Sequence, residues 1–213
     1  MKKNVIKNIV RIALFAAIAT IIDQLLSFAV PFFPDFLKFK FPDVIGLLAG
    51  FMFGPWVGTA VQSIRVVLNI LFNGTKTFYV GELSDFLLGV SFVLVSASIY
   101  KHKKTFVGAL IALGVGGLVH VAFACFLNLF FLIPVYAYAF GGLDKVILSA
   151  AKAMPAIDSL GKIILYAILP FNLLKDVIII IITLAVYKTL HRFINFVERK
   201  VYQENEEEVE TEE

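Results

Sequence analysis

Long apolar runs separated by short polar connections are the feature of this sequence that most constrains its fold. One of them reads DVIIIIITLAV at residues 176–186, and a longer one extends from residue 106 to about residue 133. A helix needs roughly 20 apolar residues to cross the hydrocarbon layer of a bilayer, so such runs predict membrane-spanning helices. The composition agrees, because 60% of the residues are hydrophobic and 16% are charged. The mean hydropathy of +0.89 also lies above the range of soluble globular domains.

The runs predict an all-α integral membrane protein, a six-transmembrane-helix bundle in which residues 1–200 form one membrane domain. The first helix follows the basic start MKKNVIKNIVR and continues to about residue 30. That length exceeds the apolar part of a cleaved signal peptide, so we expect the helix to be retained. The remaining helices are predicted at about residues 44–53, 58–72, 83–100 and 106–133, and from residue 171 onward.

Two other segments are not expected to span the membrane. Pro134 is predicted to end the fifth helix. Residues 135–170 are less apolar, and we interpret them as a long loop with one or two short amphipathic helices. The end of the chain, residues 201–213, is rich in glutamate and is predicted to be an acidic, disordered cytoplasmic tail.

Lysine and arginine gather at one end of the predicted helices, and cytoplasmic loops carry such an excess. Six crossings place both termini on the same side of the membrane, and we therefore predict that both termini are cytoplasmic. The loop at residues 31–42, the connection at 73–82 and the loop at 135–170 then lie outside. The basic residues on the predicted cytoplasmic side are Lys2, Lys3, Lys7, Arg11, Lys101, Lys103, Lys104, Lys188, Arg192, Arg199 and Lys200.

Polar side chains are predicted to converge at the outer ends of these helices. Polar groups inside a membrane are costly, so a converging set marks a functional site. Asn172 and Lys175 are three residues apart and share one face of a helix, and Asn128 could face them from the fifth helix. Aromatic residues around a few fixed polar groups form a pocket that suits a flat heteroaromatic ligand. The candidate binding residues are Asn128, Asn172, Lys175, Glu82, Leu37, Lys38, Phe39, Phe36, Asp43, Tyr79 and Phe131.

Structural explanations of these residues remain open. An asparagine in a membrane helix often makes only a hydrogen bond to a neighbouring helix, and this could apply to Asn128. Lys175 could form an ion pair with Asp176 or Glu82, or extend its ammonium to the outer interface. The aromatic residues of the first loop could form only an interfacial belt.

Other buried polar residues are expected to be structural. Arg65 is predicted to pair with Asp43 or Asp85 and so to join two helices. Asp23, late in the first helix, is expected to have a structural role. His120 lies in the middle of the fifth helix, where a hydrogen-bonded core histidine is a better prediction than a proton carrier.

Four stretches resemble a known family in order and spacing. They are FLKFKFPDVIGLLAGFMFGPWVG, GELSDFLLGVSFVLVSASIYK, LNLFFLIPVY and PFNLLKDVIIIIITLAVYK. Together they resemble the riboflavin-specific S component of the energy-coupling factor (ECF) vitamin transporters. The resemblance implies a six-helix protein of a prokaryotic cell membrane that captures riboflavin outside. It also implies partners, namely one transmembrane coupling protein and two ABC ATPase subunits.

The resemblance agrees with what the sequence lacks. It has no GxxxxGK[ST] phosphate-binding loop and none of the usual hydrolase motifs, so we expect no catalytic residues, metal, cofactor or nucleic-acid partner. In the family, an alanine-rich stretch of the first helix meets the coupling protein, and the matching positions are Ala13, Ala16 and Ala17. Small residues at this spacing allow close helix approach, although packing within the chain is the alternative.

Two other functions are weighed against this one. A small intramembrane enzyme would use Glu82, Asp85 and Asn128 for chemistry. A carrier that works alone would move a proton through Asp23, His120 or Lys175. Bound flavin would separate these possibilities, because it gives a purified protein a yellow colour.

Overall fold

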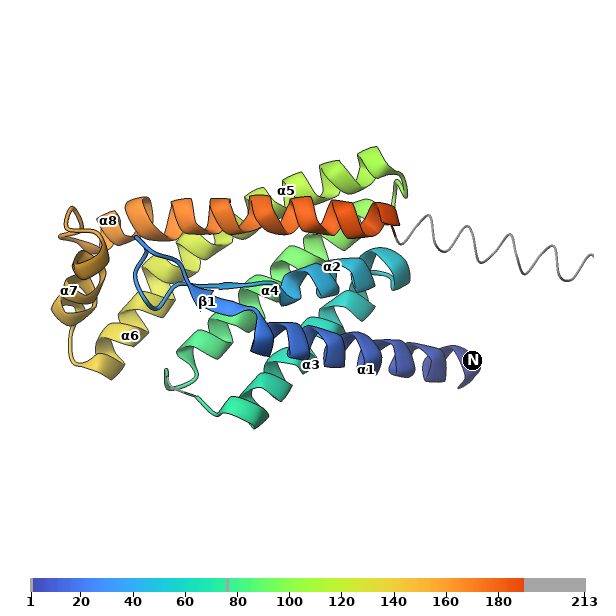
Figure 1. Cartoon of the computed structure of the whole chain (residues 1–213), viewed down its shortest axis with the longest axis horizontal. Helices are drawn as coiled ribbons and strands as arrows, with labels where there is room; N and C mark the ends of the chain where they lie inside the picture. The colour runs from blue at the N-terminus through green and yellow to red at the C-terminus, as the bar shows by residue number, and fades with distance from the viewer. Residues whose placement is uncertain (1, 76, 190–213) are drawn as a thin grey trace, which may run out of the picture.

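The computed structural model describes residues 2–75 and 77–189 of the 213-residue chain. The acidic tail predicted at residues 201–213 lies outside the described residues. Most of the described chain is helical, and the helices form one elongated bundle (Figure 1). The helices are α1 Lys2–Leu25, α2 Pro42–Phe53, α3 Pro55–Asn73, α4 Val80–Tyr100, α5 Phe106–Leu127, α6 Ile133–Phe140, α7 Leu143–Ala153 and α8 Leu160–Lys162.

Two π-helical segments, Asn128–Leu132 and Ile163–Ile168, extend this set. The first joins α5 to α6 without a break in the helix. The second follows α8, and the helix continues to the end of the described chain, so we call Leu160–Thr189 the last helix.

Within the described part of the chain, five helices are long and apolar enough to cross a membrane. They are Val5–Leu25, Pro55–Asn73, Val80–Tyr100, Phe106–Ala139 and Leu160–Thr189. The second predicted crossing corresponds to α2, which has 12 residues. At 1.5 Å per residue it is about 18 Å long, well short of a hydrocarbon layer of about 30 Å. A multi-pass helical fold is therefore present, and α2 is a short helix packed inside it.

α2 packs closely against α3 because both helices carry glycine where they meet. A Cβ atom built on Gly58 would lie 2.7 Å from the Cα of Gly50 and 2.7 Å from the carbonyl oxygen of Gly46. Any side chain at Gly58 would therefore force the two helices apart. Each helix begins with proline, Pro42 in α2 and Pro55 in α3, at the position where a missing N–H leaves no bond unmade.

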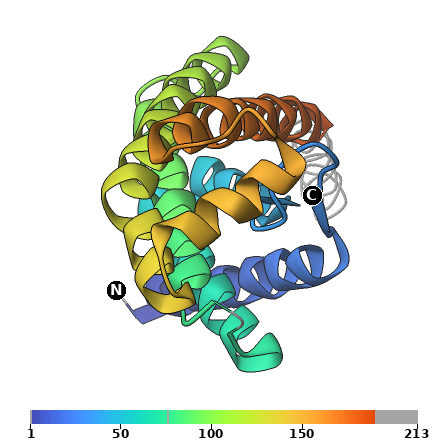
Figure 2. The ribbon, with the colours of Figure 1, turned by 90° about the vertical axis from the view of Figure 1, so that its left-hand side faces the viewer.

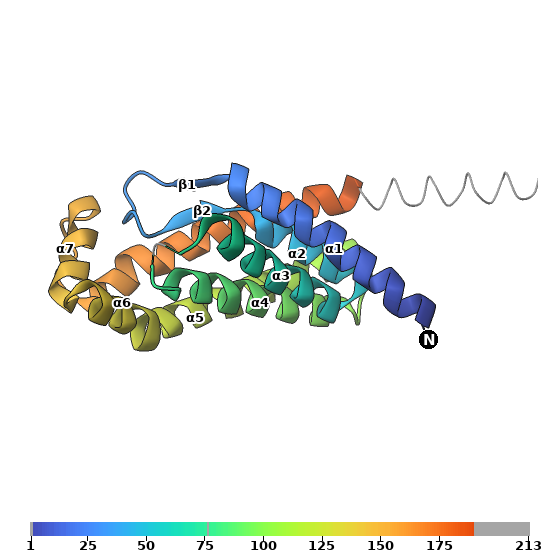
Figure 3. The ribbon, with the colours of Figure 1, turned by 90° about the horizontal axis from the view of Figure 1, so that it is seen from below.

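The first helix ends earlier than predicted, at Leu25, and the all-α expectation needs a correction there. Strand β1, Ser27–Ala29, pairs in antiparallel fashion with β2, Lys38–Lys40, so that Phe28 lies opposite Phe39. Pro31 contributes to the early end, because it cannot continue a helix and disfavours helical geometry at Val30. The two-stranded ribbon formed by β1 and β2, with the loop that joins the strands, runs beside the bundle between α1 and α7 (Figure 3).

Two prolines that were expected to bound helices lie inside them instead. Pro134 does not end the fifth helix, and the last helix begins at Leu160 rather than at residue 171, so that Pro170 lies within it. Both prolines come two residues after a π-helical segment. The i→i+5 bonding of a π segment displaces the backbone carbonyls that a proline ring would otherwise meet, which lets the helix continue.

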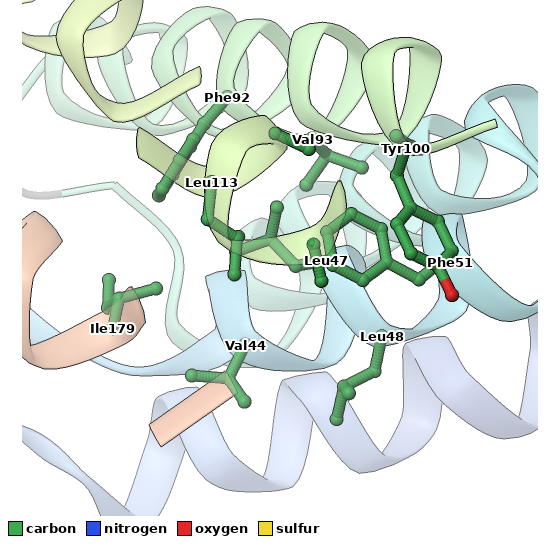
Figure 4. Packing of buried hydrophobic residues seen from close by; sticks show 12 residues of the cluster. Val44, Leu47, Leu48, Phe51, Phe92, Val93, Tyr100, Leu113 and Ile179 are labelled. Atoms are coloured by element: carbon green, nitrogen blue, oxygen red, sulfur yellow. The ribbon is translucent and has the colours of Figure 1, made fainter. Parts of the chain in front are cut away.

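The half of the bundle away from α7, which we call the packed half, contains the main hydrophobic core. Leu47, Phe51, Tyr100 and Leu113 are buried there on three different helices (Figure 4). The rings of Phe51 and Tyr100 stack with centroids 4.2 Å apart, and the hydroxyls of Tyr100 and Tyr187 are 2.7 Å apart. Aromatic stacking and apolar contact hold this half together.

The opposite end, which we call the pocket half, is closed differently. The amphipathic helix expected within residues 135–170 is α7, which crosses the end of the bundle (Figure 2). It packs Val146 and Ile147 into a cluster around Ala150 and Ile163, and Leu37 of the first loop joins the same cluster. The start of α1 and the described end of the last helix both lie at the far end, away from α7 (Figure 1).

Candidate functional site

The pocket half contains a cavity of about 910 Å³, within the usual size range of ligand sites. Its wall comes from the end of α1, the first loop, β2, α3, α4, the segment from Asn128 to α6, α7 and the last helix. Seven of the predicted binding residues contribute to this wall: Phe36, Leu37, Lys38, Glu82, Asn128, Asn172 and Lys175. Residues far apart in the sequence therefore meet in one cavity.

Two asparagines in the wall are oriented by their own helices. The amide nitrogen of Asn128 donates to the carbonyl oxygen of Ala124 at 2.8 Å, and that of Asn172 donates to Ile168 at 2.8 Å. Asn128 begins the first π segment and Ile168 ends the second, where the helical bonding pattern changes. An amide has a second N–H and a carbonyl oxygen, so each side chain can still donate and accept one bond in the cavity.

Lys175 is held by an aspartate that the sequence did not predict as its partner. Its ammonium lies 2.7 Å from Oδ2 of Asp43 in α2, and Gln62 donates to Oδ1 of the same carboxylate. The predicted partners were Asp176 and Glu82, and both are engaged elsewhere. Asp176 is the next residue along the helix and therefore points to a different side. Asp43 thus lies behind Lys175 and balances its charge.

The two predicted alternatives to Asp43 have partners of their own. Oδ2 of Asp176 lies 2.8 Å from Nδ1 of His120, and the His120 ring stacks on Phe92. His120 is therefore the hydrogen-bonded core histidine that the sequence predicted. Oε2 of Glu82 accepts hydrogen bonds from the hydroxyls of Thr75 and Thr77 at 3.1 and 2.9 Å. These bonds hold the connection between α3 and α4 against the cavity.

Four predicted binding residues lie outside the cavity wall, namely Asp43 behind Lys175, and Phe39, Tyr79 and Phe131. Phe39 is buried against Phe171, with ring centroids 5.9 Å apart, so it supports the wall from behind. Tyr79 is 58% exposed, and its φ of 66° lies in the left-handed region. Phe131 is 50% exposed. In an α-helix it would share a face with Asn128, but the wider π turn rotates it off that face and leaves Leu132 there instead.

A cluster of four charged residues forms another part of the wall. Arg65 lies 2.8 Å from Oδ2 of Asp23 and 3.3 Å from Oδ2 of Asp85. Asp85 is thus one of the two partners predicted for Arg65. Asp23, expected to be structural, joins α1 to α3 through its ion pair with Arg65. Lys40 of β2 forms an ion pair with Asp85 and lies 3.8 Å from Oδ1 of Asp23. The cluster contains two cations and two anions and is electrically balanced.

Lys40 remains charged in this position. Burial lowers the pKa of its ammonium, but the Asp85 and Asp23 carboxylates outweigh burial and raise that pKa above its ordinary value. The sequence reasoning missed Lys40, and it also missed Asn69, which donates to Asp23. A signal for Asn69 was available, because Arg65, Asn69 and Asn73 recur every four residues on one face of α3.

Helix α7 contributes a second set of residues that the sequence did not single out. Lys145, Val146 and Ser149 line the cavity at the end of the bundle that α7 crosses. Lys145 and Ser149 are four residues apart and share the face of α7 that meets the cavity. The cavity is therefore covered from two directions, by α7 and by the first loop.

Comparison with known proteins identifies the family. The family described as "ECF transporter, substrate-specific component" matches residues 7–187, most of the chain. This chain belongs to that family. The S component has relatives over nearly its whole length, so the match does not rest on one motif.

Two relatives and one solved structure show this most directly. The S component is 32% identical to riboflavin transporter RibU of Staphylococcus aureus (strain TCH60), over 91% of this chain and 94% of that protein. It is 29% identical to riboflavin transporter FmnP of Bacillus subtilis (strain 168), over 83% and 88%. A structure described as the S component of a bacterial ECF transporter superposes with a TM-score of 0.68 at 31% identity. That superposition covers 88% of this chain and 97% of the other.

The alanine-rich stretch of this S component divides between two environments. Ala13 and Ala17 are exposed on the outside of α1. Ala16 is buried, and it packs inside the chain against Ala49 and Val61. Ala16 therefore fits the alternative of packing within the chain, and an outer docking face on α1 would consist of Ala13 and Ala17.

Proposed function

We propose that this S component binds riboflavin at the outer face of a prokaryotic cell membrane and delivers it to an ATP-driven ECF transporter. The observation that carries the proposal is the convergence of Asn128, Asn172 and Lys175 on one cavity of ligand size. Two relatives named riboflavin transporters, each aligned over more than four fifths of this chain, support the choice of ligand.

The chemistry of the flavin ring suits these three side chains. Its isoalloxazine ring has a uracil-like edge, in which one N–H lies between two carbonyl groups. The amide of Asn128 or Asn172 can accept from that N–H and donate to a neighbouring carbonyl. Lys175 can donate a charge-assisted hydrogen bond to another ring acceptor, while Asp43 balances its charge. The ring can therefore be bonded along its polar edge without leaving buried groups unpaired.

The rest of the ligand is proposed to lie toward the first loop. The ribityl hydroxyls both donate and accept hydrogen bonds, and they can meet Glu82 and Lys38 in the cavity wall. Phe36 and Leu37 supply apolar contact at the same place. The first loop then covers the ligand, which shields these hydrogen bonds from water.

The arrangement in the membrane is proposed from the basic residues. The first turns of α1 and the end of the last helix lie at the same end of the bundle (Figure 1), which supports a pair of termini on one side. Lys101, Lys103 and Lys104 connect α4 to α5, and the positive-inside rule assigns them to the cytoplasm. In this orientation the cavity opens outside, and α2 serves as the sixth, incomplete crossing.

The energy for transport is proposed to come from partner subunits. The sequence contains no GxxxxGK[ST] motif, so the S component requires ATPases from elsewhere. We propose that one transmembrane coupling protein docks on the exposed Ala13 and Ala17 of α1 and is joined by two ABC ATPase subunits. Small side chains at this spacing permit the close helix contact that such docking needs.

An absorption spectrum of the detergent-purified protein tests the proposal. Riboflavin retained through purification gives a visible flavin band, and titration of riboflavin fluorescence gives the affinity. A protein that neither retains nor binds riboflavin contradicts the assignment. Vesicles that contain this chain alone should not accumulate riboflavin, and ATP-independent accumulation in them would favour a carrier that works by itself.

A further inference from the structure

The tip of the first loop, residues 30–37 between β1 and β2, packs on the bundle through side chains that include Phe33, Pro34 and Leu37. Leu37 packs into the cluster formed by α7 and the start of the last helix. Phe33 meets Phe171 edge to face, with ring centroids 5.3 Å apart. Both contacts fix the loop on the side of the last helix. They are apolar contacts, and they lie at the tip of the loop rather than at its base near α1.

Lys40 adds a polar attachment at the base of the loop, beside the chain connections to α1 and α2. The antiparallel ribbon places Lys40 opposite Ser27, at the end of β2 that enters α2. A ribbon of two short strands has little stability of its own. The ammonium of Lys40 bonds to Asp85 of α4 and lies 3.8 Å from Asp23 in the last turns of α1. One side chain therefore joins the ribbon to two separate helices.

The loop itself is compact enough to move as a unit. Its backbone forms two tight turns, in which Phe33 donates to the carbonyl of Val30 at 3.2 Å and Leu37 donates to that of Pro34 at 2.8 Å. Asp35, Phe36 and Leu37 line the cavity. Freeing the base of the ribbon would thus uncover a complete section of the cavity wall.

We propose that Lys40 is a positioning residue that anchors the first loop in its closed position and thereby sets how long a ligand stays bound. The effect on how long riboflavin stays bound rests on the proposed function, whereas the anchoring of the ribbon by Lys40 does not. Without the ammonium, Asp85 and Asp23 share only Arg65, and the ribbon loses its polar attachment to α1 and α4. Closure then depends on apolar contacts, among them those of Phe33, Phe39 and Leu37.

Hydrogen exchange of the ligand-free protein tests the anchor directly. In Lys40→Met, amides of residues 27–40 should exchange about tenfold faster than in the wild type, since one charge-assisted attachment to a partly buried carboxylate is lost. Lys152→Met is the matched control, because Lys152 is exposed on α7 outside the cavity wall, and its exchange should match the wild type. Unchanged exchange in Lys40→Met would overturn the proposal.

Riboflavin release measured by stopped-flow fluorescence supplies the second readout. The dissociation rate constant of Lys40→Met should rise about tenfold, and by more than the association rate constant changes. Asp85→Asn should show much of the same increase, and the double variant should show little more, since both changes remove one attachment. Fully multiplicative effects in the double variant would contradict an anchor through Asp85.

The two readouts separate the possible failures. Faster release without faster exchange in the ligand-free protein would mean that Lys40 acts only by touching the ligand, which overturns the anchoring role. A wild-type protein that binds no riboflavin contradicts the proposed function, and the exchange experiment still decides whether Lys40 anchors the loop. Lys40→Gln, which keeps a donor of similar length, guards against misfolding of Lys40→Met and should lie between it and the wild type.

Discussion

The two halves of the bundle are stabilised by different interactions. In the packed half, rings and aliphatic side chains from α2, α4 and the last helix fill the interior, as Phe51 and Tyr100 do. In the pocket half, ion pairs join the elements that surround the cavity. Lys175 pairs with Asp43, and Arg65 pairs with Asp23. Lipid tails are as apolar as leucine, so apolar burial gives membrane helices little driving force to associate, and polar pairs add specific contacts. The ion pairs fix how the elements around the cavity are placed relative to one another.

This comparison predicts that the two halves respond differently to substitution. Changes in the pocket half should lower affinity, alone or together with stability. Changes in the packed half should leave affinity intact and affect either the fold or the contact with a partner.

The largest expected effect is on transport. Ala13→Trp or Ala17→Trp should leave riboflavin affinity nearly unchanged and abolish uptake by vesicles that contain the complete transporter, because a bulky ring blocks close helix approach on α1. Ala16→Trp is the matched variant, and it should lower the melting temperature because Ala16 is buried against Ala49 and Val61. Normal uptake by both outer variants would show that this face of α1 meets lipid only.

Removing one member of the pair behind the cavity should have the next largest effect. Lys175→Met leaves the carboxylate of Asp43 buried without a cation, and breaking such a pair typically costs about 3–5 kcal/mol in the free energy of unfolding. Thermal and denaturant unfolding in detergent measure this loss. The double variant Lys175→Met with Asp43→Asn should recover stability without recovering affinity. Recovery of both would exclude contact between Lys175 and the ligand.

Asn172→Ala should lower affinity while leaving most of the stability. Unpaired ring groups in the closed cavity typically cost about 1–3 kcal/mol each, which corresponds to roughly a 5- to 150-fold larger dissociation constant. Fluorescence quenching with each purified variant measures the change, and a thermal melt shows whether the fold is kept. Lys175→Arg should also bind weakly, since a planar guanidinium cannot replace a compact ammonium in this position. A folded Asn172→Ala protein with unchanged affinity would refute its role in binding.

The smallest effect is expected in the packed half. Tyr187→Phe removes one hydroxyl of the pair with Tyr100, and a single hydrogen bond typically contributes about 0.5–1.5 kcal/mol to stability. The melting temperature should fall slightly and riboflavin affinity should not change. A measurable loss of affinity would mean that the two halves are energetically linked, contrary to the comparison.

Much of the candidate site was predictable because it follows from spacing along helices. Asn172 and Lys175 share a face at any standard helical geometry, and their cost in a membrane marks them as functional. Phe131 was misassigned because its direction depends on a π segment, which the sequence pattern does not signal. Lys40 was missed because its role depends on where β2 lies relative to α1 and α4.

The sequence by itself determined that this chain crosses a membrane repeatedly, and it identified the asparagines and the lysine of the cavity. These conclusions depend on hydrophobicity and on local periodicity, which each segment carries independently of the others. The tertiary structure alone decided that Asp43 balances Lys175, that Ala16 faces inward while Ala13 and Ala17 face outward, and that Lys40 joins the first loop to two helices. Each of these depends on how far apart two separately formed elements come to rest, and close packing of helices through residues such as Gly58 and Gly50 sets those distances.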